Sequence, residues 1–395
     1  MNAIETHHRP ALRENVLLAP YTTLGLGGAA RYFGDVTDRA GLRHALSFAA
    51  AQGLPLHFLG GGSNVVVADA GLEGVCLRLR LAQITCDYHA LTDDEATDEA
   101  AGIPVRVRAE AGVPWDALVA QTVTAGLSGL ECLSGIPGDV GAVAIQNVGA
   151  YGCEVGPLIE QVEVLELHSG RIRTMRGSEC DFGYRDSLFR RTIGQTLILA
   201  ITFRLAKGAP AAARYAELRA ALARAGGEVP SLSEVRAAVL GLRRGKSMVV
   251  TPEDPHSRSV GSFFQNPIVT VETADEIAAQ WATRNGAEPA AMPRFAVDSQ
   301  RCKIPAAWLI EQAGFSKGQR RGAVGISENH ALALVHYGGG TTAQLLDFAE
   351  EVQVTVAQRF AVQLHPEPVF MGFVAPPLPF AVLSPPITAP PDAAV

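Results

Sequence analysis

Two glycine-rich loops, each set beside short apolar runs, constrain the fold of this 395-residue chain more than any other feature. The first is Leu59-Gly-Gly-Gly-Ser-Asn64, and the second is Gly135-Ile-Pro-Gly-Asp-Val-Gly141, which leads into Gln146-Asn-Val-Gly-Ala-Tyr-Gly152. A loop with few side chains lets its backbone N–H groups approach an anion, so a phosphate-bearing cofactor is one interpretation. Tight turns are the alternative for either loop alone, and two such loops in one β-rich region favour the cofactor.

Short β-like runs broken by glycine extend from about Tyr21 to Leu205. Two helices are expected among them, one capped by Asp38 and one with Pro114 in its first turn. There is no regular alternation of strand and helix, so the predicted fold class is α+β. The predicted strands are 56–59, 65–68, 75–79, 105–110, 162–167, 172–175 and 197–205.

The segment 215–244 has a different pattern, with Ala, Leu and Arg at helical spacing. Ser231 and Glu234 form a capping box for its second helix. The segment is also basic, and its arginines are expected to face either a phosphate or solvent. It is interpreted as a connector between two larger units.

A second α+β unit follows the connector, with helices expected near 306–313 and 342–360. The residues from Val374 onward hold seven of the chain's 24 prolines, which predicts a disordered or loosely draped tail. The predicted divisions are 1–20 for an N-terminal extension, 21–206 for a first domain, 207–250 for the connector, 251–373 for a second domain and 374–395 for the tail.

Charge and composition exclude several classes of function. Six acidic residues between Cys86 and Gly102 account for six of the seven net negative charges, so the remainder lacks the basic excess of a nucleic-acid binder. That acidic segment is expected to be an exposed addition. No apolar run is long enough to span a bilayer, and Met1–Glu14 has no apolar secretory core, which predicts a cytoplasmic protein. The six cysteines form no CxxC pair, which predicts free thiols and no metal site.

Several common catalytic motifs do not occur. Gly25-Leu-Gly-Gly-Ala-Ala30 matches GxGxxA, but Arg31-Tyr-Phe-Gly follows where a dinucleotide-binding fold needs a helix. The chain has no P-loop, GxSxG or HExxH sequence. Phosphoryl transfer, triad hydrolysis and zinc hydrolysis therefore lack their usual residues.

Three polar residues stand in apolar or glycine-rich surroundings. They are Arg185 in FGYRDS, Ser262 in GSFFQNP and Glu367 in HPEPV. From spacing alone, ordinary structural roles are favoured: a turn hydroxyl bonded to the backbone, and surface charges or a salt bridge.

Six segments in order carry a more specific signal. They read LGGGSN, GIPGDVGAVAIQNVGAYG, FGYRDS, GSFFQNP, KIPAAWLIEQAGFSKG and PEPVFMG. Over about residues 15–373 the chain closely resembles the UDP-N-acetylenolpyruvoylglucosamine reductase family (UDP-N-acetylmuramate dehydrogenases) of type I, flavoenzymes of peptidoglycan precursor synthesis. The resemblance implies an FAD-binding domain of the vanillyl-alcohol-oxidase class followed by a C-terminal α+β substrate-binding domain.

The resemblance also implies the reaction and the roles of the three polar residues. NADPH reduces FAD, and the reduced FAD then reduces the enolpyruvyl group of UDP-N-acetylglucosamine enolpyruvate to give UDP-N-acetylmuramate. Arg185 is then expected to stabilise negative charge in an enolate-like transition state. Glu367 is expected to be a second stabiliser in its neutral form, and Ser262 to donate a proton to the adjacent carbon.

The binding residues are carried over in the same way. Tyr215 resembles a mobile tyrosine that closes over the substrate diphosphate, although helix-surface positions remain the alternative for Tyr215 and Lys246. Family members are often monomeric, so a monomer is expected. The residues expected to contact substrate are Tyr215, Lys246, Asn266 and Gln312, and those expected to contact FAD are Gly60, Gly61, Gly62, Ser63, Asn64, Gly135, Ile136, Pro137, Gly138, Gly141, Asn147, Gly149, Ala150 and Tyr151.

Two other functions were weighed against the reductase. The first is an alcohol oxidase on the same FAD domain, which has no need of Ser262 and Glu367 in this arrangement. The second is a sugar-nucleotide binder without catalysis, against which the presence of Arg185, Ser262 and Glu367 argues.

Overall fold

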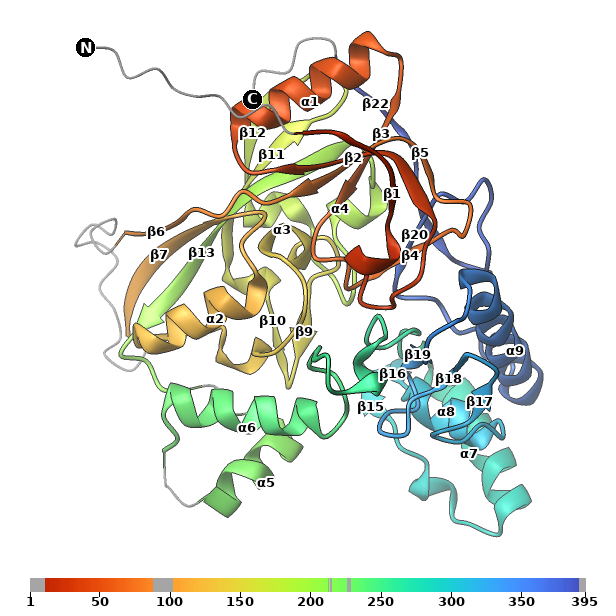
Figure 1. Ribbon diagram of the computed structural model, residues 1–395. Coiled ribbons are helices and arrows are strands. Elements are labelled where there is room, and N and C mark those ends of the chain that lie inside the picture. Colours follow the sequence, from red (N-terminus) through yellow and green to blue (C-terminus); the bar gives the residue numbers. More distant parts are fainter. Residues whose placement is uncertain (1–10, 88–101, 212, 214, 226–228, 391–395) are drawn as a thin grey trace, which may run out of the picture.

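The computed structural model describes residues 11–87, 102–211, 213, 215–225 and 229–390. Figure 1 shows a β-rich unit built from the first half of the chain and a second α+β unit built from the last third, with helices α5 (Ala216–Ala225) and α6 (Leu232–Arg244) beside the first unit. The predicted α+β class is confirmed. Most of the acidic segment, residues 88–101, lies outside the described residues.

The first sheet of the β-rich unit has the order β1-β2-β5-β3-β22. The pairs β2·β5 and β3·β5 are parallel, because helix α1 (Arg39–Ala51) carries the chain over the sheet between β2 and β3. The Asp38 side chain accepts a hydrogen bond from Gly41 N at 2.6 Å and starts this helix as predicted. The strands are β1 (Arg13–Leu17), β2 (Ala29–Val36), β3 (Pro55–Leu59), β5 (Leu72–Leu79) and β22 (Ile387–Thr388).

The second sheet is antiparallel and has the order β12-β11-β13-β7-β6, with β8 also paired to β13. Strand β7 alternates as its sequence predicts and buries Val105, Val107 and Ala109. Helix α2 (Trp115–Thr124) packs against this sheet, and Pro114 immediately precedes the helix instead of lying in its first turn. The strands are β6 (Ile84–Asp87), β7 (Ile103–Glu110), β8 (Leu127–Ser128), β11 (Ile159–Glu166), β12 (Ile172–Arg176) and β13 (Thr196–Lys207).

Short elements and a helix pair complete this half of the molecule. The Ser231–Glu234 capping box is present at the start of α6, and Arg236 of that helix pairs with Asp116 at 2.6 Å. Arg236, one of the connector arginines expected to face either phosphate or solvent, therefore attaches the connector to α2. The elements are α3 (Val140–Val143), β9 (Gly149–Ala150), β10 (Cys153–Glu154), α4 (Leu188–Arg191), α5 (Ala216–Ala225) and α6 (Leu232–Arg244).

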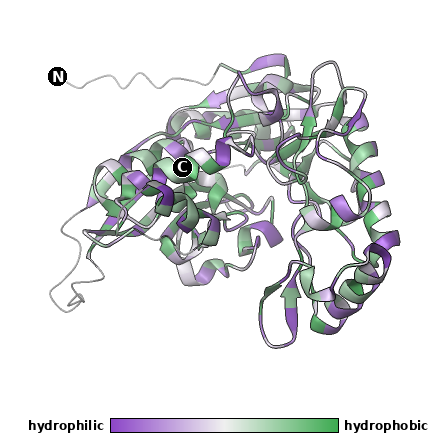
Figure 2. Ribbon diagram, turned by 90° about the horizontal axis from the view of Figure 1, so that it is seen from below, coloured by the Kyte–Doolittle hydropathy of each residue, from purple (hydrophilic) through white to green (hydrophobic). Residues whose placement is uncertain are grey.

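The second unit packs three helices and short strands around one apolar core. Helix α9 begins with the predicted Thr341–Gln344 capping box. Figure 2 shows hydrophilic residues interspersed with hydrophobic ones along the outer helices. Within the described ranges, no helix is long and apolar enough to cross a membrane. The elements are β14 (Ile268–Thr270), α7 (Val271–Asn285), β15 (Phe295–Ala296), β16 (Arg301–Lys303), α8 (Ala306–Gln312), β17 (Arg320–Arg321), β18 (Val324–Ile326), β19 (Leu334–His336), α9 (Thr342–Phe360) and β20 (Val369–Met371).

The two units are joined through a small shared sheet of the order β21-β20-β4, in which β4 (Val65–Val67) belongs to the first unit. Strand β20 pairs with β4 in parallel, so that Val369 lies opposite Val65. The Asp69 carboxylate accepts hydrogen bonds from the backbone of Thr342 at 2.8 Å and Ala343 at 2.9 Å, at the start of α9. The second unit is therefore held to the strand that follows the first glycine-rich loop.

The expectation of a disordered tail is wrong for the described residues 374–390. They form β21 (Val382–Ser384), which pairs with β20, and β22, which pairs with β3. Proline is compatible with this arrangement because a strand at a sheet edge needs hydrogen-bond donors on one side only. Similarly, part of the expected N-terminal extension forms β1 at the other edge of the same sheet.

Candidate active site

A cavity of about 320 Å³ lies where the two units meet. Its walls come from the two glycine-rich loops, the segment around α4, the end of α6 and the strand region 367–371. The lining residues that the sequence singled out are Gly60, Gly61, Gly62, Ser63, Asn64, Ile136, Pro137, Gly141, Gly149, Arg185, Ser262 and Glu367.

The two glycine-rich loops form one structure, which we call the glycine cradle (residues 60–64 and 135–141). A Cβ on Gly62 would lie 1.9 Å from the Tyr21 carbonyl oxygen, and one on Gly61 would lie 2.8 Å from Gly138 Cα. The Ser63 hydroxyl donates to the Pro137 carbonyl at 3.0 Å. Glycine is therefore required for the loops to approach each other, and not only for turning the chain.

The cradle and its surroundings fit a phosphate-bearing cofactor with an extended apolar part. Within the described residues, the N–H groups of Gly61, Gly62 and Ser63 donate no hydrogen bond. The Arg243 Nε and the Asp139 Oδ2 are buried beside the cavity without partners. Such unsatisfied donors and acceptors are costly unless a ligand meets them. The residues present therefore fit the FAD that the sequence predicts.

Arg185 reaches the cavity from the loop before α4. Its backbone is left-handed, with φ of 53°, a conformation that costs a non-glycine residue roughly 1–3 kcal/mol. The Arg185 guanidinium donates to the Gly149 carbonyl at 2.9 Å and forms an ion pair with Glu367 at 3.3 Å. These two contacts fix the planar cation on the cavity wall.

Glu367 enters the same region from the second unit, two residues before β20. Its backbone N–H donates to the Phe263 carbonyl at 2.9 Å, and Gln146 Nε2 donates to its carboxyl at 3.3 Å. Burial raises the pKa of the Glu367 carboxyl, and Arg185 and Arg190 oppose that rise. The protonated form is therefore more accessible here than for a glutamic acid in water.

Ser262 lies on a turn that lines the cavity between Gly261 and Phe263. The Phe263 N–H donates to the Leu332 carbonyl at 2.8 Å, and the rings of Phe263 and Phe264 are fully buried. The apolar neighbours thus anchor the turn, and the Ser262 hydroxyl makes no hydrogen bond within the part of the chain that the structure describes. The ordinary interpretation of a turn hydroxyl bonded to the backbone does not apply.

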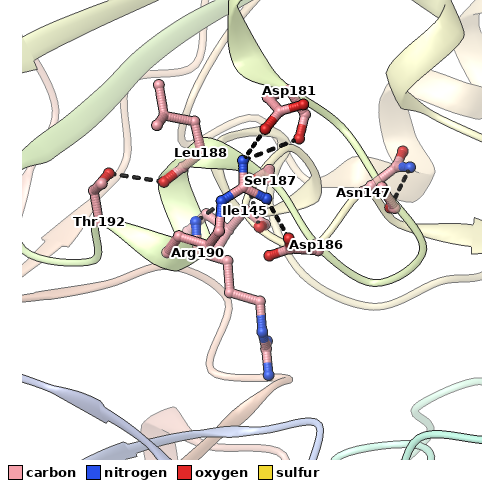
Figure 3. A network of polar contacts seen from close by, with 10 residues as sticks. Ile145, Asn147, Asp181, Asp186, Ser187, Leu188, Arg190 and Thr192 are labelled. Atoms are coloured by element: carbon pink, nitrogen blue, oxygen red, sulfur yellow. Dashed lines mark hydrogen bonds and ion pairs between the residues drawn. The ribbon is translucent and has the colours of Figure 1, made fainter. Parts of the chain in front are cut away.

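Sequence reasoning missed Arg190 and Gln146, although Gln146 lies within one of the six segments and Arg190 comes three residues after the end of another. Arg190 is buried, and its Nη1 donates to the Glu367 carbonyl at 3.1 Å and to Gln146 Oε1 at 3.4 Å. Figure 3 shows the Arg190 side chain extending away from the polar contacts of Asp181 and Asp186. Its position five residues after Arg185, where the chain enters a helix, was the only signal in the sequence for this second cation.

Asn147 lies beside the cavity without lining it. Its amide nitrogen donates to Glu154 and to the Gly183 carbonyl, both at 2.9 Å, and its oxygen accepts from Gly156 N at 2.8 Å. The side chain therefore binds loops together, and the contact in Figure 3 is one of these. Gly135, Gly138 and Ala150 also belong to the cavity-forming loops but are not among the lining residues.

The four residues expected to bind substrate divide into two groups. Tyr215 packs edge-on against Tyr151 with ring centroids 5.7 Å apart, and Lys246 Nζ lies 5.9 Å from the Tyr151 ring centroid and pairs with Glu217 at 2.7 Å. Burial raises the pKa of Tyr151 to about 12. These residues form a polar group next to the cradle instead of lining the cavity.

Asn266 and Gln312 are engaged within the second unit. Asn266 Oδ1 accepts from Ala306 N at 2.8 Å at the start of α8, and Gln312 Oε1 accepts from Trp281 Nε1 at 2.8 Å. The side-chain oxygen of Gln312 is thus directed to the core of the second unit. The structure does not bring Gln312 to the cavity.

The fold defines a flavoprotein, with a cavity at the junction of two units whose residues fit FAD. Residues 32–176 match the family model described as an FAD binding domain. Residues 253–371 match the model described as the C-terminal domain of UDP-N-acetylenolpyruvoylglucosamine reductase.

The chain belongs to the UDP-N-acetylenolpyruvoylglucosamine reductase family. It is 44% identical to the protein of that name from Thermobifida fusca over 359 residues, which covers 91% of this chain and 97% of the relative. The Saccharopolyspora erythraea protein is 43% identical over 357 residues, with 90% and 94% covered. The crystal structure of the Thermus caldophilus reductase matches with a TM-score of 0.57 at 25% identity, covering 91% of this chain and 99% of that one. The resemblance inferred from six segments is confirmed.

Asp139 provides a pH-dependent test of the cavity. Burial raises the pKa of its carboxyl to about 6 from 3.8. The contribution of Asp139 to the stability of the folded protein is therefore fully present below the pKa that its carboxyl has in the unfolded chain. That contribution is lost as pH rises through about 6. We expect Asp139→Asn to raise the melting temperature of the FAD-free protein at about pH 8 and to change it little at about pH 4.

Asp347→Asn, at an exposed position on α9, is the matched control and should give the same shift at both pH values. A pH-independent effect of Asp139→Asn would contradict the assignment of a buried, unpartnered carboxyl.

Proposed function

We propose that this chain reduces the enolpyruvyl group of UDP-N-acetylglucosamine enolpyruvate with NADPH and FAD, yielding UDP-N-acetylmuramate for peptidoglycan synthesis. The observation that carries the proposal is that Arg185, Glu367 and Ser262 line one cavity together with the glycine cradle. Bound FAD supplies a two-electron carrier that accepts hydride from NADPH and delivers hydride to the substrate double bond.

Arg185 and Glu367 are proposed to stabilise the charge that develops during reduction. Addition of hydride to the terminal carbon leaves carbanion character beside the substrate carboxylate, and that charge spreads onto oxygen. The Arg185 guanidinium is always cationic and can hold two oxygens at once. Protonated Glu367, favoured by its raised pKa, can donate a further hydrogen bond to the same charge.

Ser262 is proposed to donate the proton that completes the reaction at the adjacent carbon. A hydroxyl is a weak acid in water, so its position beside a reactive enolate must supply the advantage. The absence of any hydrogen-bond partner for this hydroxyl within the described residues supports the role, because it leaves the group available to substrate. The hydride and this proton together account for the two hydrogens that the double bond gains.

The polar group next to the cradle is proposed to hold the substrate diphosphate. Burial, together with Lys246, Lys317 and Arg243, lowers the pKa of His330 to about 4. An excess of positive charge around one buried imidazole favours an anionic ligand at this place. Tyr215, Lys246 and Asn266 retain their proposed roles as substrate contacts.

Direct contacts to FAD are proposed for those residues predicted from the sequence that line the cavity. Asn147 and Tyr151, which the sequence also predicted as FAD contacts, are proposed to hold the surrounding loops. A monomeric state, which follows from the family resemblance, and a cytoplasmic location remain proposals.

The proposed function is tested by following the flavin absorbance band without oxygen. NADPH should bleach the band, and subsequent addition of UDP-N-acetylglucosamine enolpyruvate should restore it rapidly. Restoration only on admission of air would favour an alcohol oxidase. A protein that binds flavin and substrate but is never reduced would favour the non-catalytic binder.

Ser262→Ala tests the proton donor. The variant should retain FAD and its reduction by NADPH, while reoxidation by the enolpyruvyl substrate slows by about 10²- to 10⁴-fold, the usual contribution of a general acid. Stopped-flow absorbance separates the two half-reactions.

The matched control is Ser259→Ala, because the Ser259 hydroxyl accepts a hydrogen bond from Gly261 N at 3.1 Å in the same turn. Equal slowing in the two variants would assign Ser262 a structural role only.

Glu367→Gln tests the second stabiliser. The amide keeps the size of the side chain, but its N–H is a much weaker acid than the O–H of a protonated carboxyl and stabilises developing negative charge less, so the second half-reaction should slow about 10- to 100-fold while the first is unchanged. In the wild type that half-reaction should decline as pH rises through the raised pKa of Glu367, whose surroundings include Arg185, Arg190 and Tyr184. The variant should lack this decline, and slowing of both half-reactions alike would indicate a general structural defect instead.

A further inference from the structure

The segment after β20 extends beyond the residues that match the C-terminal family model, which end at 371. It is anchored first to the second unit. The rings of His365 and Phe380 stack with centroids 4.1 Å apart and an interplanar angle of 11°. Gln353 Nε2 donates to the Pro379 carbonyl at 3.2 Å, and Leu378 is only 2% exposed.

The segment then crosses back to the first unit. Val382 and Ser384 lie opposite Val369 and Met371 in the parallel pair β20·β21. Ile387 lies opposite Leu56 on β3, in an antiparallel pair at the edge of the first sheet. We call residues 382–389 the C-terminal strap, because they connect the sheet shared by both units to the sheet of the first unit.

The C-terminal strap contributes directly to the cavity. Ser384 and Ile387 both line it, as do Phe58 and Leu59 of β3, Ile193, Gly194 and residues 196–198. Ile387 also packs with the apolar core beneath α1, and Ala389 next to it is buried. Ile387 therefore packs against the core and also lines the cavity.

The part of the cavity that the strap covers lies away from the reacting groups. Ser384 lies opposite Met371, which is four residues after Glu367, and four residues of extended chain cover roughly 13 Å. Strand β3, which the strap pairs with, runs directly into the glycine cradle at Gly60. A flavin nucleotide with its reacting ring at Glu367 and its phosphates at the cradle would place its remaining, nucleoside part on this side.

We propose that the C-terminal strap is part of the FAD site, with Ile387 as an apolar contact and Ser384 as a polar contact to the nucleoside part of the cofactor. This inference rests on the proposed function, since it takes FAD as the ligand of the cavity. The strap retains the cofactor and takes no part in hydride transfer. Two short strand pairs attach it to the rest of the molecule, and a segment held by few backbone hydrogen bonds can open locally.

Hydrogen exchange on the wild-type chain tests the strap without any substitution. FAD added to the FAD-free protein should slow exchange of the Ser384 and Ile387 amides by at least about tenfold, because a covered segment opens less often. The Ile172 amide on β12 is the internal reference and should not change.

Ile387→Ala tests the apolar contact. Titration of the FAD-free variant, followed by flavin fluorescence, should give a dissociation constant about 5- to 20-fold above the wild type, since part of a buried apolar side chain is lost. Ile172→Ala, at a position that is 39% exposed on an edge strand, is the matched control and should leave the constant unchanged. Ser384→Ala provides a second, milder variant, with a smaller rise expected.

The outcomes separate the two proposals. If FAD binds Ile387→Ala and Ser384→Ala as tightly as the wild type and does not protect the strap amides from exchange, the proposed role of the strap is wrong. The reductase assignment is unaffected by that result. A wild-type chain that binds no FAD overturns the proposed function itself. Urea unfolding of each FAD-free variant identifies any weakening that comes from a general loss of stability.

Discussion

The parallel pairing of β4 with β20 is the interaction on which the arrangement of the site depends. Strand β4 follows the first glycine-rich loop, and β20 follows Glu367. Their register therefore fixes the carboxyl of one unit relative to the cradle of the other. The Asp69 carboxylate at the start of α9 strengthens the same junction, because it meets backbone N–H groups that would otherwise lack partners.

Around this junction, charge is balanced within a buried region. Arg185 and Arg190 stand on either side of Glu367, one at its carboxyl and one at its backbone carbonyl. Two cations near one carboxyl limit the rise in its pKa, so the group remains able to change protonation state. The left-handed backbone of Arg185 is held by the Gly149 carbonyl and by Glu367, which places strain where a rigid cation is needed.

The sequence predicted the regular elements well wherever local chemistry determines them. The Asp38 cap, the alternation of β7 and the capping boxes before α6 and α9 depend on neighbouring residues alone, and all occur as predicted. The tail was wrongly predicted because its strands depend on β20 and β3, partners distant in sequence, and its proline content gave no sign of them. Composition can indicate a weak tendency to form strands, but not the presence of an available sheet edge.

The candidate site shows the same division between local and distant information. The glycine loops could be found from their local composition, whereas Arg185, Ser262 and Glu367 were singled out through the resemblance of six segments in order, because their spacing alone favoured ordinary structural roles. Arg190 and Gln146 were missed because their contacts with Glu367 form only when the second unit brings that residue beside them. The sequence could not indicate whether Gln312 reaches the cavity, because its hydrogen-bond partner Trp281 belongs to another helix.

The pairing of β4 with β20 also has a consequence for synthesis of the protein. Contacts between residues some 300 positions apart in the chain cannot form until the later strand has left the ribosome. The first unit emerges early with its glycine cradle, but the wall that contains Glu367 and the strap is made last. The cavity is therefore completed only at the end of synthesis, so a chain that stops short keeps the glycine cradle and lacks the residues that close the cavity.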